Sequence, residues 1–396
     1  MTQKAVIIIT ALLGVACVAM YFVMQMPKLQ PELPEERTQG FVVLQLDTSC
    51  LGALTLWNDG IVVGNARGEI RLFDDLQDGA KPRVFPVSPY PIIAPVFEKD
   101  GVFFVGDTNG RFFAFDPQVI ADRSTDIGAK WSHKTYNQIT GSAIWCDGMV
   151  IVGSHDCTLY ALDSETGELK YSVDCNDRVN GTPLFLETQH ALVFGSCDGL
   201  LRKIDVRTGE KIAEIDFEAY IPETPAYFDG ILYLLTRSFG EPMDDDGNES
   251  QGELTAVDAE SFALLWRVPT RDMYLSAPYA TNELLFLTTD VKGKINVHSR
   301  KDGQYLTTLD TEEKMTTLQA GDDSRVFAVS RLGKLYQWQR EGSQVALLPN
   351  DRWNRTLLAD LQTDCKRGCL LIGNKLIVAD DNGGLFYCTI DEKDEM

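Results

Sequence analysis

One repeated pattern limits the fold more than any other feature of the chain. Each copy has an apolar strand, a tight turn, and a second strand of alternating apolar residues that often ends on aspartate. The copies occupy residues 60–74, 101–116, 148–163, 190–205, 230–236 rejoined by 252–258, 283–299, 324–339 and 375–389. A unit of this kind cannot bury its apolar face alone, so we expect the copies to pack against one another within one domain.

The turn inside each copy recurs at regular intervals. It falls at Gly68, Gly110, Cys157, Gly199, Gly252, Gly293, Gly333 and Gly383, so the intervals run from 40 to 53 residues. A period in the forties with several strands per unit is typical of a β-propeller. Glycine recurs because such turns need positive φ, which strains other residues. Cys157 is therefore the position where we expect backbone strain.

Two further segments complete each unit. Upstream lies a short apolar segment, often with proline, which we interpret as the innermost strand; examples are residues 92–95, 179–183, 221–225 and 275–278. Downstream lies an outer strand, as at residues 130–132, 170–172 and 265–267. The prediction is an all-β propeller over residues 41–390, with four antiparallel strands per blade and an acidic tail at 391–396. We expect eight blades; seven stays an alternative, because the first unit is the least regular and the last two are loosely spaced.

The two ends of the repeat region complement each other. The chain stops soon after the third strand of the eighth unit, while the apolar run Phe41–Leu46 precedes the first unit and has no blade of its own. We expect this run to complete the last blade. Closing the ring in this way removes an exposed sheet edge.

The N-terminus carries a candidate membrane span. Residues 5–24 are twenty residues without a charge, which is long enough for a helix to cross the hydrocarbon core of a bilayer. We predict an uncleaved signal anchor over residues 1–26 and a proline-containing linker over 27–40. Two alternatives stay open: a cleaved signal peptide, and a lipoprotein signal with Cys17 as the lipidated residue. Lys4 favours the N-terminus inside and the propeller on the extracytoplasmic side, which we expect to be the periplasm.

The net charge of the chain limits the classes of macromolecule that it can bind. The formal net charge is −22, whereas nucleic-acid binders usually present a basic face. We therefore expect no nucleic-acid partner, and we expect partners among proteins at the membrane or in the periplasm.

The chain has nine cysteines, and their spacing does not match a zinc site. In a blade, the turn between the second and third strands lies on the same face as the connection from the previous blade. A disulfide between Cys175 and Cys197 is therefore a hypothesis.

Few residues point to catalysis. The four histidines, His133, His155, His190 and His298, lie in different units, and we expect surface or loop roles for them. No nucleophile elbow, phosphate-binding loop or zinc-protease motif occurs. Asp244, Asp246 and Asn248 have some calcium-ligand character, but the spacing of a calcium loop is missing, so we interpret them as part of an acidic surface loop. We predict no catalytic residue, no metal and no cofactor.

Three units continue past the aspartate in a specific way, at residues 161–168 (ALDSETGE), 204–210 (IDVRTGE) and 257–260 (VDAE). These segments resemble the A-x-D-x-x-T-G-x-x-x-W repeat of the pyrroloquinoline-quinone-like propellers. Tyr171 or Ile212 stands where the motif ends in tryptophan, and Trp266 keeps it. One branch of this superfamily contains quinoprotein dehydrogenases, several of which have adjacent cysteines at the cofactor. This chain has no adjacent cysteines, so its resemblance is to the other branch, the BamB-like propellers.

The resemblance implies a non-enzymatic, membrane-tethered scaffold for protein–protein interaction, active in envelope or outer-membrane protein assembly. The alternative is a quinoprotein-like propeller that binds a cofactor or small ligand in its central funnel. That alternative predicts charged residues from several blades converging on the axis, and its candidates are Arg178, Glu223 and Arg271.

Overall fold

The structure is a computed structural model that describes most of the repeat region. The described residues are 42–45, 52–58, 60–76, 80–118, 129–238, 252–270, 276–288, 293–310, 313–320, 323–341, 353–365, 369–372, 375–380 and 383–389. The predicted anchor (1–26) with Cys17, the predicted linker (27–40), the acidic loop with Asp244, Asp246 and Asn248, and the predicted tail (391–396) lie outside them. Within the described part of the chain, no helix has the length and apolar character needed to span a bilayer.

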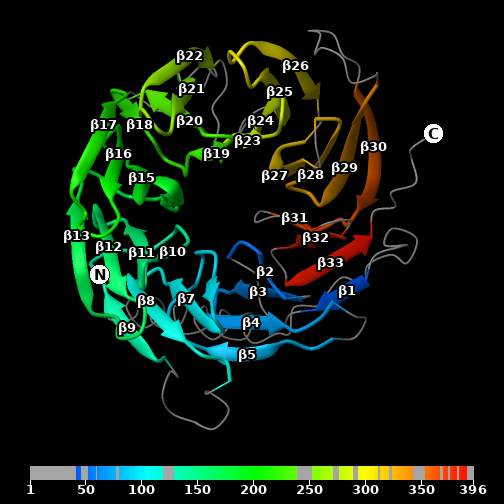
Figure 1. Ribbon diagram of the computed structural model, residues 1–396. Helices are drawn as coiled ribbons and strands as arrows, with labels where there is room; N and C mark the ends of the chain where they lie inside the picture. Colours follow the sequence, from blue (N-terminus) through cyan, green and yellow to red (C-terminus); the bar gives the residue numbers. More distant parts are fainter. Residues whose placement is uncertain are drawn as a thin grey trace, which may run out of the picture. The chain divides into compact units, whose positions relative to one another are not determined.

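The described strands form eight antiparallel sheets, the blades of a propeller (Figure 1). Blade 1 is β2 (Thr55–Trp57), β3 (Gly60–Gly64), β4 (Glu69–Phe73) and β5 (Arg83–Pro86); blade 2 is β6 (Phe97–Lys99), β7 (Val102–Gly106), β8 (Arg111–Phe115) and β9 (Trp131–Lys134). Blade 3 is β10 (Ile144–Cys146), β11 (Met149–Ser154), β12 (Thr158–Asp163) and β13 (Leu169–Asp174); blade 4 is β14 (Leu184–Leu186), β15 (Ala191–Gly195), β16 (Leu200–Asp205) and β17 (Lys211–Asp216), with a 3-10 turn, η2 (Glu187–Gln189), after β14.

The second half of the chain continues the series. Blade 5 is β18 (Ala219–Tyr220), β19 (Ala226–Phe228), β20 (Ile231–Ser238), β21 (Gly252–Asp258) and β22 (Leu264–Thr270); blade 6 is β23 (Tyr279–Ala280), β24 (Leu284–Thr288), β25 (Lys294–Ser299) and β26 (Tyr305–Asp310). Blade 7 is β27 (Met315–Ala320), β28 (Arg325–Ser330), β29 (Lys334–Arg340) and β30 (Trp353–Asp360); blade 8 is β31 (Cys369–Ile372), β32 (Lys375–Ala379), β33 (Gly384–Thr389) and β1 (Val42–Gln45). The prediction of eight blades is confirmed, and the seven-blade alternative is wrong.

Blade 8 joins the two ends of the repeat region. Its strand order is β1-β33-β32-β31, and β1 lies antiparallel to β33 with Val42 opposite Tyr387 and Gln45 opposite Gly384. Blade 8 also packs against blade 1, because Ile61 and Val63 share a buried cluster with Ile377. The predicted closure by the run before the first unit is confirmed.

The core lies between neighbouring blades. Val62 and Ile70 of blade 1 share a fully buried cluster with Phe103 of blade 2, and Ile151 of blade 3 shares one with Phe194 of blade 4. The second and third strands of these blades carry four or more consecutive buried residues, because each face of the sheet is covered by the next sheet. Blade-to-blade burial is the dominant stabilising contribution in such a repeat architecture.

One strand assignment from the sequence is wrong. The proline-containing segments that we interpreted as innermost strands are irregular connections, and the innermost strand begins just after the proline. Pro183 is followed at once by β14 and Pro225 by β19. The connection keeps its own hydrogen bonds: the Val179 amide donates to the Ser154 carbonyl, 3.1 Å, and the Ile221 amide to the Ser196 carbonyl, 3.3 Å.

The repeated turn has the expected backbone. Positive φ occurs at Gly68, Gly110, Gly199, Gly293, Gly333 and Gly383, and Cys157 shares it with a φ of 70°. The strain expected at Cys157 is therefore present. Gly252 differs, because it begins strand β21, where it pairs with Arg237.

We expect Cys157→Gly to raise the free energy of unfolding by about 1 kcal/mol, because glycine adopts positive φ without a steric cost. Urea denaturation measures the change. The matched reverse change is Gly110→Ala, where a Cβ would lie 2.2 Å from the Asn137 carbonyl oxygen, and we expect it to destabilise the fold. A less stable Cys157→Gly variant would contradict this account of the turn.

Adjacent blades are also held together by an aromatic side chain of one blade that packs on a glycine of the next. Trp131 of blade 2 donates from its indole nitrogen to the Ser164 carbonyl of blade 3, 3.0 Å, and a Cβ on Gly167 would lie 2.5 Å from the Trp131 ring. Tyr171 of blade 3 covers Gly209 of blade 4 in the same manner. Sequence reasoning missed Trp131 in this role, because Trp131 lies fifteen positions after Asp116, whereas the motif places its tryptophan eight positions after the aspartate.

At the equivalent place in blade 4, the structure corrects the assignment of Ile212 to the aromatic position of the motif. Strand pairing passes from Lys203↔Ala213 to Ile204↔Lys211, so Ile212 is the extra residue of a β-bulge and is 53% exposed. Ala213 holds the position that Tyr171 holds in blade 3. The small alanine is matched by a large partner, because Phe262 of blade 5 stands where blades 3, 4 and 6 have Gly167, Gly209 and Gly303, and it is buried with a φ of 57°.

Candidate functional site

The first candidates are the acidic side chains at the turns between second and third strands. Asp107 accepts the backbone amides of Asn109 and Arg111, each at 2.8 Å, and Asp380 accepts the Gly384 amide, 2.5 Å. Ser88, in the connection from blade 1 into blade 2, donates to Asp107, 2.6 Å. These carboxylates hold the turns in shape, so their hydrogen-bonding capacity is largely used by the fold.

A buried ion pair strengthens one of these turns. Arg202 of β16 makes a bidentate contact with Asp198, with nitrogen–oxygen distances of 3.0 and 2.5 Å, and the two side chains are 8% and 4% exposed. Burial favours the neutral acid, but hydrogen bonds from Arg202, from Ser196 and from two backbone amides outweigh it and lower the pKa of Asp198 to about 2. The pair is thus a structural element with a permanent charge on both partners.

Two of the three axial candidates from the sequence, Arg178 and Glu223, lie among the described residues, and they do not interact. Arg178 pairs with its neighbour Asp177, 3.3 Å, with half of its side chain exposed. Glu223 lies at the connection into blade 5, and no interaction between it and Arg178 is present. Arg271 lies outside the described residues. The arrangement expected for a charged central funnel is therefore not found among the described residues.

Glu223 nevertheless occupies an unusual position. Four residues in the connections before the inner strands are equivalent to Glu223, namely Gly52, Ala94, Gly141 and Gly181. A Cβ added to any of the three glycines would meet the backbone of the equivalent residue in the next connection. A Cβ on Gly141 would lie 2.9 Å from the Gly181 carbonyl oxygen, and one on Gly181 would lie 3.0 Å from the Glu223 carbonyl carbon. Glu223 is the one ionisable residue among these five positions.

The carboxyl of Glu223 has no hydrogen-bond or ionic partner among the described residues. Its neighbour Thr224 is engaged, since its hydroxyl accepts the Thr182 amide, 2.7 Å, and Thr182 in turn accepts the Ser142 amide, 3.0 Å. Glu223 keeps an exposed surface, yet crowding by surrounding protein atoms raises the pKa of its carboxyl to about 7. Burial without a nearby cation favours the neutral form of a carboxyl.

The histidines are separate, as expected, but one is not at the surface. His298 in β25 is 5% exposed, its Nδ1 lies 2.8 Å from the Gly303 carbonyl oxygen, and burial lowers its pKa. The expected surface or loop role is wrong for His298. His155 contacts Gln138 and Thr140 through its two ring nitrogens, at 2.9 and 3.1 Å. Both are explained by packing and hydrogen bonding within the fold.

The hypothetical disulfide stays a prediction. Cys175 and Cys197 carry free thiols in the structure, and burial raises the pKa of Cys175 to about 11. Cys197 accepts a hydrogen bond from Asn180, 3.4 Å. Within the described ranges, no group of three or more histidine, cysteine, aspartate and glutamate side chains is placed to hold a metal ion.

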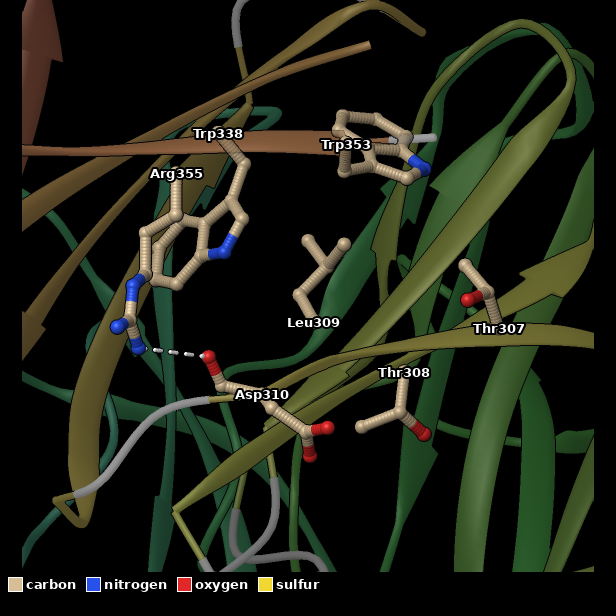
Figure 2. Close-up of a pocket in the computed structure, with 7 residues that line it drawn as sticks. All are labelled: Thr307, Thr308, Leu309, Asp310, Trp338, Trp353 and Arg355. Carbon is tan, nitrogen blue, oxygen red and sulfur yellow. Dashed lines mark hydrogen bonds between the residues drawn. The ribbon is translucent and has the colours of Figure 1, made fainter. Parts of the chain in front are cut away.

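A pocket of about 340 Å³ lies between blades 6 and 7 (Figure 2). Thr307, Thr308, Leu309, Asp310, Trp338, Trp353 and Arg355 line it. The Arg355 guanidinium donates to the Asp310 carbonyl, 3.2 Å, and lies 5.4 Å from the centre of the Tyr336 ring. The close-up shows the Leu309 side chain between the two indole rings. The pocket holds no nucleophile with a paired base, so its chemistry is that of packing between two blades.

Comparison with known proteins gives the family. A family profile described as outer membrane protein assembly factor BamB matches residues 118–212 and 197–318, which together are just over half of the chain. The chain belongs to this BamB-like family of PQQ-type repeat propellers. No curated protein matches it.

Two solved structures show how widely this BamB-like fold occurs. BamB from Moraxella catarrhalis is 17% identical, with a TM-score of 0.66, and the match covers 90% of this chain and 100% of that one. The computationally designed protein Ika8 is 16% identical, with a TM-score of 0.65, and the match covers 87% and 98%. At these identities the likeness establishes the fold alone, and a designed protein shares it; the function therefore has to be argued from the surface of this BamB-like chain.

Proposed function

We propose that this BamB-like propeller is a non-enzymatic interaction scaffold, held at a membrane by its N-terminal segment with the propeller on the periplasmic side, and that it acts in outer-membrane protein assembly. The observation that carries the proposal is the family match, since it covers the repeats themselves. The acidic side chains at the turns agree with it, because they are engaged in holding loops and leave the faces of the ring as preformed surfaces.

The test is the abundance of outer-membrane proteins. Native cells that lack this chain should show a several-fold fall in outer-membrane β-barrel proteins, measured by quantitative mass spectrometry of the isolated membrane. Re-expression of the whole chain should restore them. Unchanged barrel protein levels in cells without the chain would contradict an assembly role.

The quinoprotein alternative makes a different prediction. A ligand that binds the folded state raises the melting temperature by mass action. We expect no change in the melting temperature of the full-length chain when pyrroloquinoline quinone and calcium are added together, because no interaction joins Arg178 and Glu223, the two axial candidates that the structure describes. A rise of several degrees, together with a new absorbance band of bound quinone, would support the alternative and count against the scaffold.

A further inference from the structure

Two cysteines of blade 3 lie at facing positions of one hairpin. The register of β12 and β13 places Leu159 opposite Val173, and both side chains belong to the apolar cluster between blades 3 and 4. Side chains alternate between the two faces of a strand, so the next pair on this face is Cys157 and Cys175. The Cys175 side chain packs against the same cluster, and the Cys175 amide donates to the Cys157 carbonyl, 2.7 Å.

The same backbone contact occurs in four other blades, which allows the position to be compared around the ring. In each, the residue just after the outer strand donates its amide to the carbonyl of the turn residue: Ser88 to Gly68, Thr135 to Gly110, Phe217 to Gly199 and Leu361 to Gly333. Cysteine stands at both positions in blade 3 and at neither position in these four blades. Among the five, the turn position is therefore a cysteine only where the facing residue is also a cysteine.

Blade 2 shows how close the two side chains of such a pair come. A Cβ placed on Gly110, the counterpart of Cys157, would lie 2.7 Å from Oγ1 of Thr135, the counterpart of Cys175. In a disulfide, each Cβ lies roughly 3 Å from the sulfur of the other residue. Cys157 shares the positive φ of Gly110, which directs its Cβ toward the facing side chain. The strained backbone at Cys157 thus favours a bond to Cys175.

The Cys175 sulfur occupies the place of that threonine oxygen. The Thr135 hydroxyl lies 3.3 Å from the Ser154 hydroxyl at the turn of the next blade, and the Cys175 sulfur is hydrogen-bonded to Ser196, the counterpart of Ser154 in blade 4. Burial is the main cause of the raised pKa of Cys175, and the nearby Cys157 also raises it. The two sulfur atoms therefore lie within electrostatic range of each other.

The third cysteine of this region has a different environment. Cys197 accepts a hydrogen bond from Asn180, 3.4 Å, in the connection before the inner strand of blade 4. His155, its counterpart in blade 3, contacts Gln138 and Thr140 of the preceding connection, at 2.9 and 3.1 Å. The side chain at this position faces the connection before the inner strand and not the residue just after an outer strand. We therefore expect Cys197 to keep its free thiol.

We propose that Cys157 and Cys175 are a modification site, at which an oxidising disulfide such as oxidised glutathione closes a bond between the two sulfur atoms. The Cys157 thiolate attacks one sulfur of the oxidant, whose S–S bond breaks and releases one thiolate. The Cys175 thiolate then attacks the Cys157 sulfur of the mixed disulfide and displaces the second thiolate. The two cysteines are oxidised, the oxidant is reduced to two thiols, and these take up the two protons.

The bond ties the strained turn to the end of the outer strand. It closes the hairpin of β12 and β13 and limits the freedom of the unfolded chain, so the oxidised chain should melt roughly 5 °C above the reduced chain. The stability gain expected for Cys157→Gly applies to the reduced chain, because in the oxidised chain this change also removes the bond. The proposed periplasmic location would supply an oxidant, but the pairing does not depend on the scaffold function.

Peptide mapping tests the pairing on the unchanged full-length chain. The purified chain is fully reduced and equilibrated with oxidised glutathione, its free thiols are alkylated, and it is cleaved before each aspartate. This cleavage places the three cysteines in separate peptides, which are 156–162 for Cys157, 174–176 for Cys175 and 177–197 for Cys197. Mass spectrometry without reduction should find 156–162 joined to 174–176. A link between 174–176 and 177–197, or Cys157 and Cys175 left unlinked, would overturn the proposal.

Serine variants give a second readout. The difference in melting temperature between the oxidised and the reduced chain should vanish in Cys157→Ser and in Cys175→Ser. Cys197→Ser is the matched control, because it removes a thiol from the adjacent turn and should keep the full difference. Circular dichroism of each reduced variant confirms that it is folded. A difference that is lost in Cys197→Ser and kept in Cys157→Ser would contradict the pairing.

Discussion

A chain that begins at residue 47 should be far less stable than one that begins at residue 41. The two chains differ by residues 41–46, which contain β1 (Val42–Gln45), the strand that pairs with β33 and closes the ring. Losing about four strand hydrogen bonds and the cover over Leu385 and Phe386, which are 1% exposed, should lower the free energy of unfolding by roughly 4 kcal/mol or more. The exposed edge of β33 should also promote aggregation.

The comparison is controlled because both truncated chains lack residues 1–40, so any effect of removing the predicted anchor and linker is shared. Urea midpoints report the stability, and light scattering reports the aggregation. Equal midpoints for the two chains would show that β1 does not close the ring in solution.

The second large effect is expected at the Arg202–Asp198 pair. Removal of one partner from a buried ion pair leaves an uncompensated charge and costs roughly 3–5 kcal/mol. Arg202→Leu and Asp198→Asn should both destabilise the fold by this order, measured by urea denaturation. Lys211→Ala is the matched control, since its contact with Glu214 is at the surface, with a lysine side chain that is 61% exposed; it should change stability by less than about 1 kcal/mol.

This pair also gives a pH dependence with a definite sign. The folded-state pKa of Asp198 is lowered to about 2, below that of the unfolded chain. Its stabilising contribution is therefore complete above about pH 4 and is lost as the pH falls toward 2. Asp198→Asn should flatten the loss of stability across this window. An unchanged acid profile in the variant would contradict the assignment.

The sequence predicted the elements that depend on local chemistry. Alternating apolar strands, turn glycines and the unpaired run before the first unit were enough for eight blades and their closure. Cys157 was recognised because positive φ is costly for any residue with a Cβ. These features are readable because each depends on a residue and its immediate neighbours.

The features that depend on register could not be predicted. The proline segments look like strands, because they are apolar, yet their amides bond to the preceding blade and not to a ladder. The sequence placed Ile212 at the aromatic position of the motif, which Ala213 holds in the structure, because a β-bulge shifts the strand pairing by one residue. Glu223 was singled out from the sequence as an axial charge, but no interaction joins it to Arg178 in the structure.

The central claim is that this chain works by binding other proteins, and crosslinking of the intact chain in its native cells tests it most directly. The full-length protein is crosslinked in place, purified, and its partners are identified by mass spectrometry against a control without crosslinker. The account predicts a defined set of envelope proteins, among them proteins of outer-membrane assembly. Recovery of no specific protein from a chain shown to be folded would contradict it.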